Sequence, residues 1–246
     1  MKRIDGRKAN ELREIKIKRD YIEYAEGSVL IEVGKTKLIC AASVEDKVPQ
    51  FLRGSGSGWI TAEYSMLPRS TPVRTFRDST IGRVKGRTHE IQRLIGRSLR
   101  AVVDLDKIGD RTIWIDCDVI QADGGTRTAA ITGACIALYD CLNKVVSQGK
   151  IIYLPIMDFV GATSVGLVNG EILLDLCFEE DNKAQADMNV VITSKGEIVE
   201  IQVTAEDKPL SKDIFQKMLK VAEEGIKKII DIQSDLIGKD IDKLKK

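Results

Sequence analysis

The sequence predicts an α+β protein that consists of two related halves. Two hairpin-like segments, 28–44 and 162–178, share one pattern: each alternates apolar and polar residues, turns at a glycine and ends beside an acidic cluster. This weak internal repeat, together with amphipathic segments long enough to form helices, favours two pseudo-duplicated halves in one compact unit, 1–150 and 151–246. Chance similarity between two amphipathic hairpins is the alternative.

The expected strands follow from alternation or from short apolar runs bounded by turn residues. They span 12–19, 28–34, 36–44, 111–120, 162–168, 171–178, 188–193 and 197–204. Apolar residues at helical spacing predict helices at 87–103, 126–146 and 211–232. Between strands and helices, 53–83 is rich in Gly, Ser, Thr, Pro and Arg, which predicts a long functional loop. The lysine-rich end, 239–246, is expected to fray.

Composition narrows the class of protein. The chain has 246 residues, 43% of them hydrophobic and 30% charged, with no apolar run of the roughly 20 residues that a membrane span requires. Its polar beginning lacks the apolar segment of a signal peptide. The five cysteines are odd in number and scattered through apolar runs, so we expect buried thiols in a reducing, cytoplasmic setting. A single histidine, His89, argues against a Cys–His catalytic pair.

Basic residues gather in one segment although the net charge is only +1. Between Arg53 and Arg100 there are nine arginines and one lysine against three acidic residues. A solvated patch or a subunit interface would explain this excess. The preference for arginine over lysine favours forked contacts with phosphate or carboxylate groups.

Gly124-Gly125-Thr126-Arg127 lies between an expected strand and an expected helix. The glycines allow close backbone approach, Thr126 can cap the helix, and the free N–H groups with the helix dipole form an anion site. A glycine turn followed by an ordinary cap is the alternative.

The helix at 87–103 begins with an arginine in line with its apolar face. Arg87 precedes Ile91 and Leu94 by four and seven residues, so we expect it to enter the interior and to need an anionic partner from protein or ligand. Arg93, Arg97 and Arg100 form a separate stripe, which favours a subunit interface or a solvated face.

Two carboxylates stand six residues apart, between two expected strands. Asp181 and Asp187 can hold Mg²⁺ or supply a proton to a leaving oxygen, although acidic loops between strands are common without function. Taken together, the basic segment, the anion site and this pair fit phosphate chemistry on an anionic polymer. The sequence has no Walker-type phosphate loop and no zinc-ligand spacing.

Several stretches resemble the bacterial-type ribonuclease PH family of phosphorolytic 3′→5′ exoribonucleases. They are 58–71, 86–88, 90–100, 116–128 and 187–191, and the resemblance runs in order from Asp5 to about Leu236. It implies mixed-sheet-plus-helix halves with βαβ units of left-handed-type crossover, and homo-hexameric rings built as trimers of dimers. It also implies cleavage by inorganic phosphate at the 3′ ends of tRNA precursors, with release of nucleoside diphosphates.

The resemblance further assigns residue roles. It implies phosphate binding by Arg87, Gly125, Thr126 and Arg127, Mg²⁺ or leaving-group chemistry at Asp181 and Asp187, and RNA contacts from Arg69, Arg74 and Arg77. The chain departs from the family pattern at His89, at Ala130 and within 201–207, without loss of a proposed catalytic group. An archaeal exosome-type subunit that needs a partner, a silent RNA-binding ring subunit and a hydrolytic Mg²⁺ nuclease are the alternatives.

Overall fold

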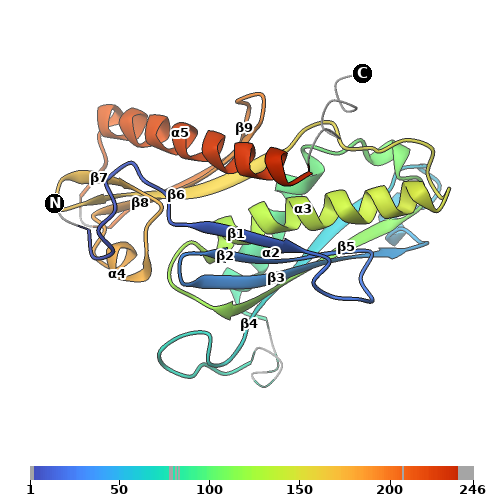
Figure 1. The fold of residues 1–246 in the computed structure, drawn as a ribbon, viewed down its shortest axis with the longest axis horizontal. Coiled ribbons are helices and arrows are strands. Elements are labelled where there is room, and N and C mark those ends of the chain that lie inside the picture. Colours follow the sequence, from blue (N-terminus) through green and yellow to red (C-terminus); the bar gives the residue numbers. More distant parts are fainter. Residues whose placement is uncertain (1–2, 78–79, 81, 83, 207, 238–246) are drawn as a thin grey trace.

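The computed structural model describes residues 3–77, 80, 82, 84–206 and 208–237. Two β-sheets and their helices form one elongated body, with the first sheet low and the second sheet beneath the long C-terminal helix in Figure 1. The tail expected to fray, 239–246, lies outside the described residues.

The first sheet has the strand order β1-β2-β3-β5-β4. Its strands are β1 (Ile15–Arg19), β2 (Gly27–Val33), β3 (Thr36–Glu45), β4 (Trp59–Met66) and β5 (Thr112–Gln121). Among the described strands only β4 and β5 pair in parallel, and helix α2 (Gly86–Arg100) lies between them in the chain and packs on β4. Two short 3-10 helices, η1 (Gln50–Leu52) and η2 (Leu105–Lys107), lie in the connections. This half therefore contains a βαβ unit.

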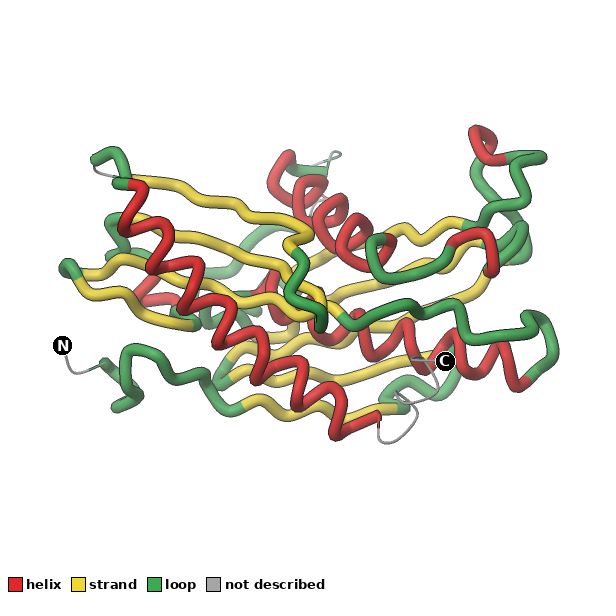
Figure 2. Tube along the Cα trace, turned by 90° about the horizontal axis from the view of Figure 1, so that it is seen from above, coloured by secondary structure: helices red, strands yellow, loops and turns green. Residues whose placement is uncertain are grey.

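The second sheet has the strand order β7-β6-β8-β9. Its strands are β6 (Val160–Val168), β7 (Glu171–Leu174), β8 (Ala186–Thr193) and β9 (Ile198–Ala205), and every described pair is antiparallel. A short helix, α4 (Phe178–Asp181), connects β7 to β8. Helix α5 (Lys212–Ile237) packs along β6, and Figure 2 shows it crossing the sheet obliquely.

Helix α3 (Thr126–Ser147) is the central element of the core. It packs against β2 and β3 of the first sheet and against β6 of the second, so both halves bury side chains on it. Among the described residues it is the one helix long and apolar enough to cross a membrane, and 83% of that apolar window is buried inside the fold. Burial against two sheets is the physical reason that apolar residues extend all round this helix.

The predicted α+β class with two sheet-and-helix halves is confirmed, whereas some elements differ. Strand β4 lies inside the segment 53–83 that we expected to be loop. The expected strand 171–178 ends at Leu174, because Asp175 adopts a left-handed backbone (φ 54°) and the chain then turns into α4.

The arginine stripe of α2 is largely used within the chain. Arg97 forms a two-pronged ion pair with Glu200 of β9, with N–O distances of 2.7 to 2.9 Å. Arg100 donates to the carbonyl of Ile60 and stacks on the ring of Trp59 at 4.3 Å. Arg93 is exposed. The stripe therefore joins the two halves and braces β4, a role that the sequence pattern did not indicate.

Candidate active site

The turn between β5 and α3 has a backbone that favours glycine. Gly124 and Gly125 have φ values of 75° and 64°, in the left-handed region. A Cβ atom on Gly124 would stand 2.5 Å from the carbonyl oxygen of Leu176, so the two halves touch here without room for a side chain. This close approach brings the start of α3 to the chain that leads into α4.

Thr126 was expected to cap α3, and that expectation is wrong. Gly125 occupies the capping position and no side chain caps the helix, while Thr126 is the first helical residue. Its hydroxyl instead accepts a hydrogen bond of 2.8 Å from the buried Tyr64 of β4. Burial raises the pKa of Tyr64, opposed by the Thr126 contact and by the charges of Arg87 and Arg127. The helix start therefore keeps an anion-binding character.

Arg127 extends from the first turn of α3 towards the second half. Its Nη1 donates to the side-chain oxygen of Gln202 on β9 at 3.1 Å and lies 3.8 Å from a carboxylate oxygen of Glu90. Gln202 in turn donates to Glu200, the partner of Arg97. A chain of polar contacts thus holds the Arg127 guanidinium in place.

Arg87 does not enter the interior as expected, because the first turn of α2 extends beyond the core and its side chain is exposed. No described residue forms an ion pair with it, yet its charge acts on both Tyr64 and Asp181. Arg87 is therefore a cation at the edge of the same site.

The structure brings Asp181 and Asp187 together from two elements. Asp181 ends α4, and the half-buried Asp187 is the second residue of β8. Asp181 is exposed, yet partial desolvation of its carboxylate raises its pKa, against the opposing charges of Arg127 and Arg87. Burial and the negative charges of Asp181 and Glu206 raise the pKa of Asp187, while the positive charge of Arg127 lowers it. The two carboxylates therefore repel each other beside a cationic site.

The three arginines that we expected to contact RNA are exposed in the segment after β4, which projects from the first sheet in Figure 1. Arg69 donates to the carbonyl of Pro72 at 2.9 Å. The Arg74 guanidinium lies over the ring of Phe76, 5.6 Å from its centroid. Burial raises the pKa of Asp118, and the positive charge of Arg77 partly offsets that rise. All three lie on this exposed loop, which is joined to the end of β5 by a hydrogen bond from the N–H of Ala122 to the carbonyl of Ser70.

Sequence reasoning did not find the ion pairs behind the site. Arg13 pairs with Asp175, and Arg3 pairs with Glu180 next to Asp181, all four being buried. Each pair joins residues more than 160 positions apart, so spacing along the chain carries no signal for it. The sequence shows that Arg3 and Arg13 are present near the N-terminus, but it does not show which carboxylates they bind.

Comparisons with known proteins identify the family of the chain. The model of the 3′ exoribonuclease family, domain 1, matches residues 11–142, and that of domain 2 matches residues 158–225. Ribonuclease PH of Moorella thermoacetica is 57% identical over 238 residues, which covers 97% of this chain and 95% of the relative.

Two solved structures share the fold. An Archaeoglobus fulgidus exosome chain, from a structure with RNA bound to the active site, has a TM-score of 0.81 at 22% identity and covers 95% of this chain and 93% of its own. Rice (Oryza sativa) Rrp46 has a TM-score of 0.75 at 18% identity, with coverage of 94% and 98%. At these identities the solved structures show only that the fold is shared, whereas the family models and the 57% identical relative show the family. The chain belongs to the ribonuclease PH family of phosphorolytic 3′→5′ exoribonucleases.

Proposed function

We propose that this enzyme shortens the 3′ ends of tRNA precursors by transferring each terminal nucleotide to inorganic phosphate. One observation carries the proposal: an uncapped helix start, two arginines and two carboxylates, contributed by both halves, meet at one place. This is the arrangement that a reaction between two anions requires, since both must be neutralised and aligned.

Inorganic phosphate is assigned to the start of α3. The backbone N–H groups of the Gly124–Gly125 turn, the Thr126 hydroxyl, the helix dipole and the Arg127 guanidinium would bind its oxygens, with Arg87 on the exposed side. The hydrogen bond from Tyr64 leaves the Thr126 hydroxyl with its own proton to donate. The site thus offers donors and positive charge, and Gln202 holds the Arg127 guanidinium in place.

The acidic pair is assigned to Mg²⁺ and to the leaving group. The described residues contain no cluster of three or more candidate metal ligands. Two carboxylates nevertheless fit Mg²⁺, because that ion is commonly held by one or two carboxylates together with substrate phosphates and water. The mutual repulsion of Asp181 and Asp187 would be relieved by a cation. When bound, Mg²⁺ would supply charge neutralisation at the scissile phosphate.

The proposed reaction is a single displacement at phosphorus. A phosphate oxygen forms the new P–O bond while the bond to the 3′ oxygen of the penultimate nucleotide breaks, so the terminal nucleotide leaves as a diphosphate. The 3′ oxygen must gain a proton, from water or from Asp187, whose raised pKa keeps a larger fraction of it protonated at a given pH than in an ordinary aspartate. The bonds made and broken are alike, so excess diphosphate should reverse the reaction.

The remaining assignments divide the work within the chain. Residues 1–150 would bind phosphate and RNA, and 151–246 would carry the acidic pair. Arg69, Arg74 and Arg77 would contact RNA phosphates, which explains their exposure. We also propose a cytoplasmic homo-hexamer, a trimer of dimers. Free, buried thiols at all five cysteines accord with a reducing compartment.

Product analysis on a 3′-extended tRNA precursor tests the proposal. With Mg²⁺, we expect nucleoside diphosphates only when phosphate is added, and at least a hundredfold loss of rate in Asp187→Asn. The matched control is Asp235→Asn, a neutralised aspartate on α5. Nucleoside monophosphates formed without phosphate would indicate hydrolysis and refute the proposal.

A measurement of assembly size separates the proposal from an exosome-type subunit. We expect the purified chain alone to be hexameric and active by light scattering and by the same product assay. Activity that appears only after a different chain is added would support the exosome-type alternative.

A further inference from the structure

A buried arginine that is hydrogen-bonded to both halves stands behind the candidate phosphate site. Arg13 is 6% exposed and grips Asp175 with two prongs, Nε to Oδ2 at 2.9 Å and Nη2 to Oδ1 at 2.6 Å, while its backbone N–H also donates to Oδ2. Gly34 leaves space for this side chain, since a Cβ there would stand 2.7 Å from Arg13 Cδ. A buried guanidinium in this geometry is fixed in position.

The Arg13 guanidinium also donates hydrogen bonds to the turn that precedes α3. Nη1 donates to the carbonyl oxygen of Asp123 at 2.5 Å and Nη2 to that of Gly124 at 3.4 Å. In a trans peptide the C=O and the following N–H point in opposite directions. Carbonyls drawn back towards Arg13 therefore turn the N–H groups of Gly124 and Gly125 to the opposite side, and neither N–H donates to any acceptor among the described residues.

A second side chain holds the same peptides independently. The fully buried hydroxyl of Thr36 donates to the carbonyl of Gly124 at 2.7 Å and accepts the N–H of Asp123 at 2.9 Å. Arg13, just before β1, and Thr36, the first residue of β3, thus fix one turn from behind, and neither had a role in the predictions from sequence.

We infer that Arg13 and Thr36 are positioning residues, which aim the N–H groups of the Gly124–Gly125 turn at inorganic phosphate. Asp175 completes the device by fixing the guanidinium, and its own carbonyl is held by Arg3 and Arg7. This inference rests on the proposed phosphate site at the start of α3. Neither residue touches the phosphate in this arrangement, so both act through the orientation of the backbone.

The prediction is a selective loss of phosphate affinity. Arg13→Lys keeps the charge but loses the fork, and Thr36→Val keeps the shape but loses the hydroxyl. A misdirected N–H forfeits a hydrogen bond to a charged group, so the KM for phosphate should rise roughly ten- to a hundredfold. At saturating phosphate, kcat should stay within about threefold of the wild type, because the groups that touch the reacting atoms are intact.

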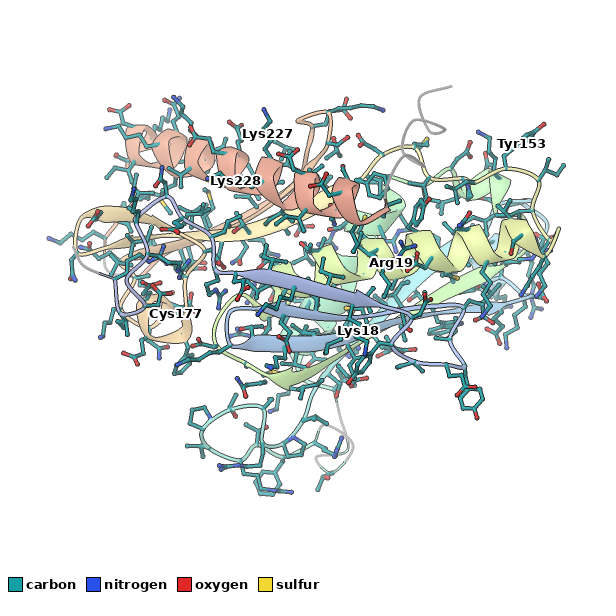
Figure 3. All side chains as sticks on the ribbon, viewed as in Figure 1. Lys18, Arg19, Tyr153, Cys177, Lys227 and Lys228 are labelled. Atoms are coloured by element: carbon teal, nitrogen blue, oxygen red, sulfur yellow. The ribbon has the colours of Figure 1, made fainter. Side chains whose placement is uncertain are left out.

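Two controls separate positioning from general loosening. Thr36→Ser restores the hydroxyl and should return the KM for phosphate to within about twofold of the wild-type value. Arg19→Lys makes the same chemical change in another arginine–carboxylate ion pair, that of Arg19 with Asp140. Figure 3 shows that Arg19 lies well away from Cys177, which stands at the start of α4 near the candidate site. Arg19→Lys should lower the melting temperature and leave the KM for phosphate unchanged.

Each remaining outcome decides the inference. Wild-type KM values in folded Arg13→Lys and Thr36→Val would overturn it, as would an equal rise in Arg19→Lys. Should Arg13→Lys fail to fold, Thr36→Val decides alone, because it preserves packing. A wild-type enzyme indifferent to phosphate would overturn the proposed function together with this inference, whereas a phosphate-dependent wild type with unaffected variants overturns the inference alone.

Discussion

Replacing Gln202 by glutamate tests how the structure holds the proposed phosphate arginine. In the wild type a neutral oxygen accepts from Arg127 at 3.1 Å, and the amide nitrogen donates to Glu200 at 3.0 Å. Gln202→Glu puts a negative charge on Arg127 while changing the shape very little. The carboxylate then competes with phosphate for the same guanidinium, so phosphate affinity should fall.

The magnitude follows from the distance and the exposure. Two unit charges about 4 Å apart attract by roughly 4 kcal/mol at an effective dielectric constant near 20. The Arg127 side chain is 18% exposed and Glu200 stands beside the new charge, so about 1–2 kcal/mol is a better expectation. The KM for phosphate should then rise about five- to thirtyfold. Gln202→Leu only removes the hydrogen bond to the Arg127 guanidinium and should raise the KM for phosphate about two- to fivefold.

The assay is the initial rate of diphosphate release as a function of phosphate concentration at fixed tRNA precursor. Gln148→Glu is the matched control: it adds the same charge just after α3 ends, at the opposite end from Arg127, and should leave the KM for phosphate unchanged. A Gln202→Glu enzyme with the wild-type value, or with a smaller rise than Gln202→Leu, would contradict the competition between carboxylate and phosphate.

The remaining predictions concern protonation, the helix start and the RNA loop. Because folding raises the pKa of Asp181 and of Asp187, their ionisation destabilises the folded chain. That cost is absent below the ordinary aspartate pKa and complete above the raised one, so Asp187→Asn should raise the melting temperature at neutral pH. If the pair holds Mg²⁺ as ionised groups, the rate should fall on the acid side and added Mg²⁺ should move that fall to lower pH, whereas a fall on the alkaline side would identify Asp187 as a proton donor. Tyr64→Phe removes the donor to Thr126 and should raise the KM for phosphate about threefold, with circular dichroism unchanged. Arg74→Ala should weaken precursor binding and reduce its salt slope by about 1, measured by filter binding, without changing the KM for phosphate.

The helices could be predicted well from the sequence, because amphipathic periodicity is a local property. Helix α3 begins at Thr126 as expected and ends one residue later than expected. Strand β4 was missed although its buried Ile60, Ala62 and Tyr64 alternate with more exposed residues. Glycines and serines before it and arginines after it masked the alternation, and the parallel partner that stabilises it, β5, lies about 50 residues further along the chain.

The candidate site divides in the same way. An anion site at Gly124-Gly125-Thr126 could be proposed from turn and helix-start chemistry alone, whereas the role of Arg127 came from the family resemblance and the capping role of Thr126 was wrong. The position of Arg87 was misjudged, because a helical pattern does not show where a helix extends past its core. The meeting of Asp187 with Arg127 depends on how the second sheet docks on α3, which is a property of packing between distant segments.

The contacts between the halves concentrate at the site, and this has a physical consequence. Arg13–Asp175 and Arg97–Glu200 both join the first half to the second, and both end one or two contacts from the proposed phosphate groups. The buried Arg13–Asp175 pair is costly to break on one side, since the remaining charge is left without a partner, whereas the Arg97 side chain is 40% exposed and its pair with Glu200 is weaker. Any movement of one half relative to the other must therefore disturb these pairs before it separates the apolar core around α3. These two ion pairs therefore help to fix the phosphate-binding groups relative to the two carboxylates. The repulsion between Asp181 and Asp187 is not relieved by either pair, and we expect the substrate and its cation to relieve it.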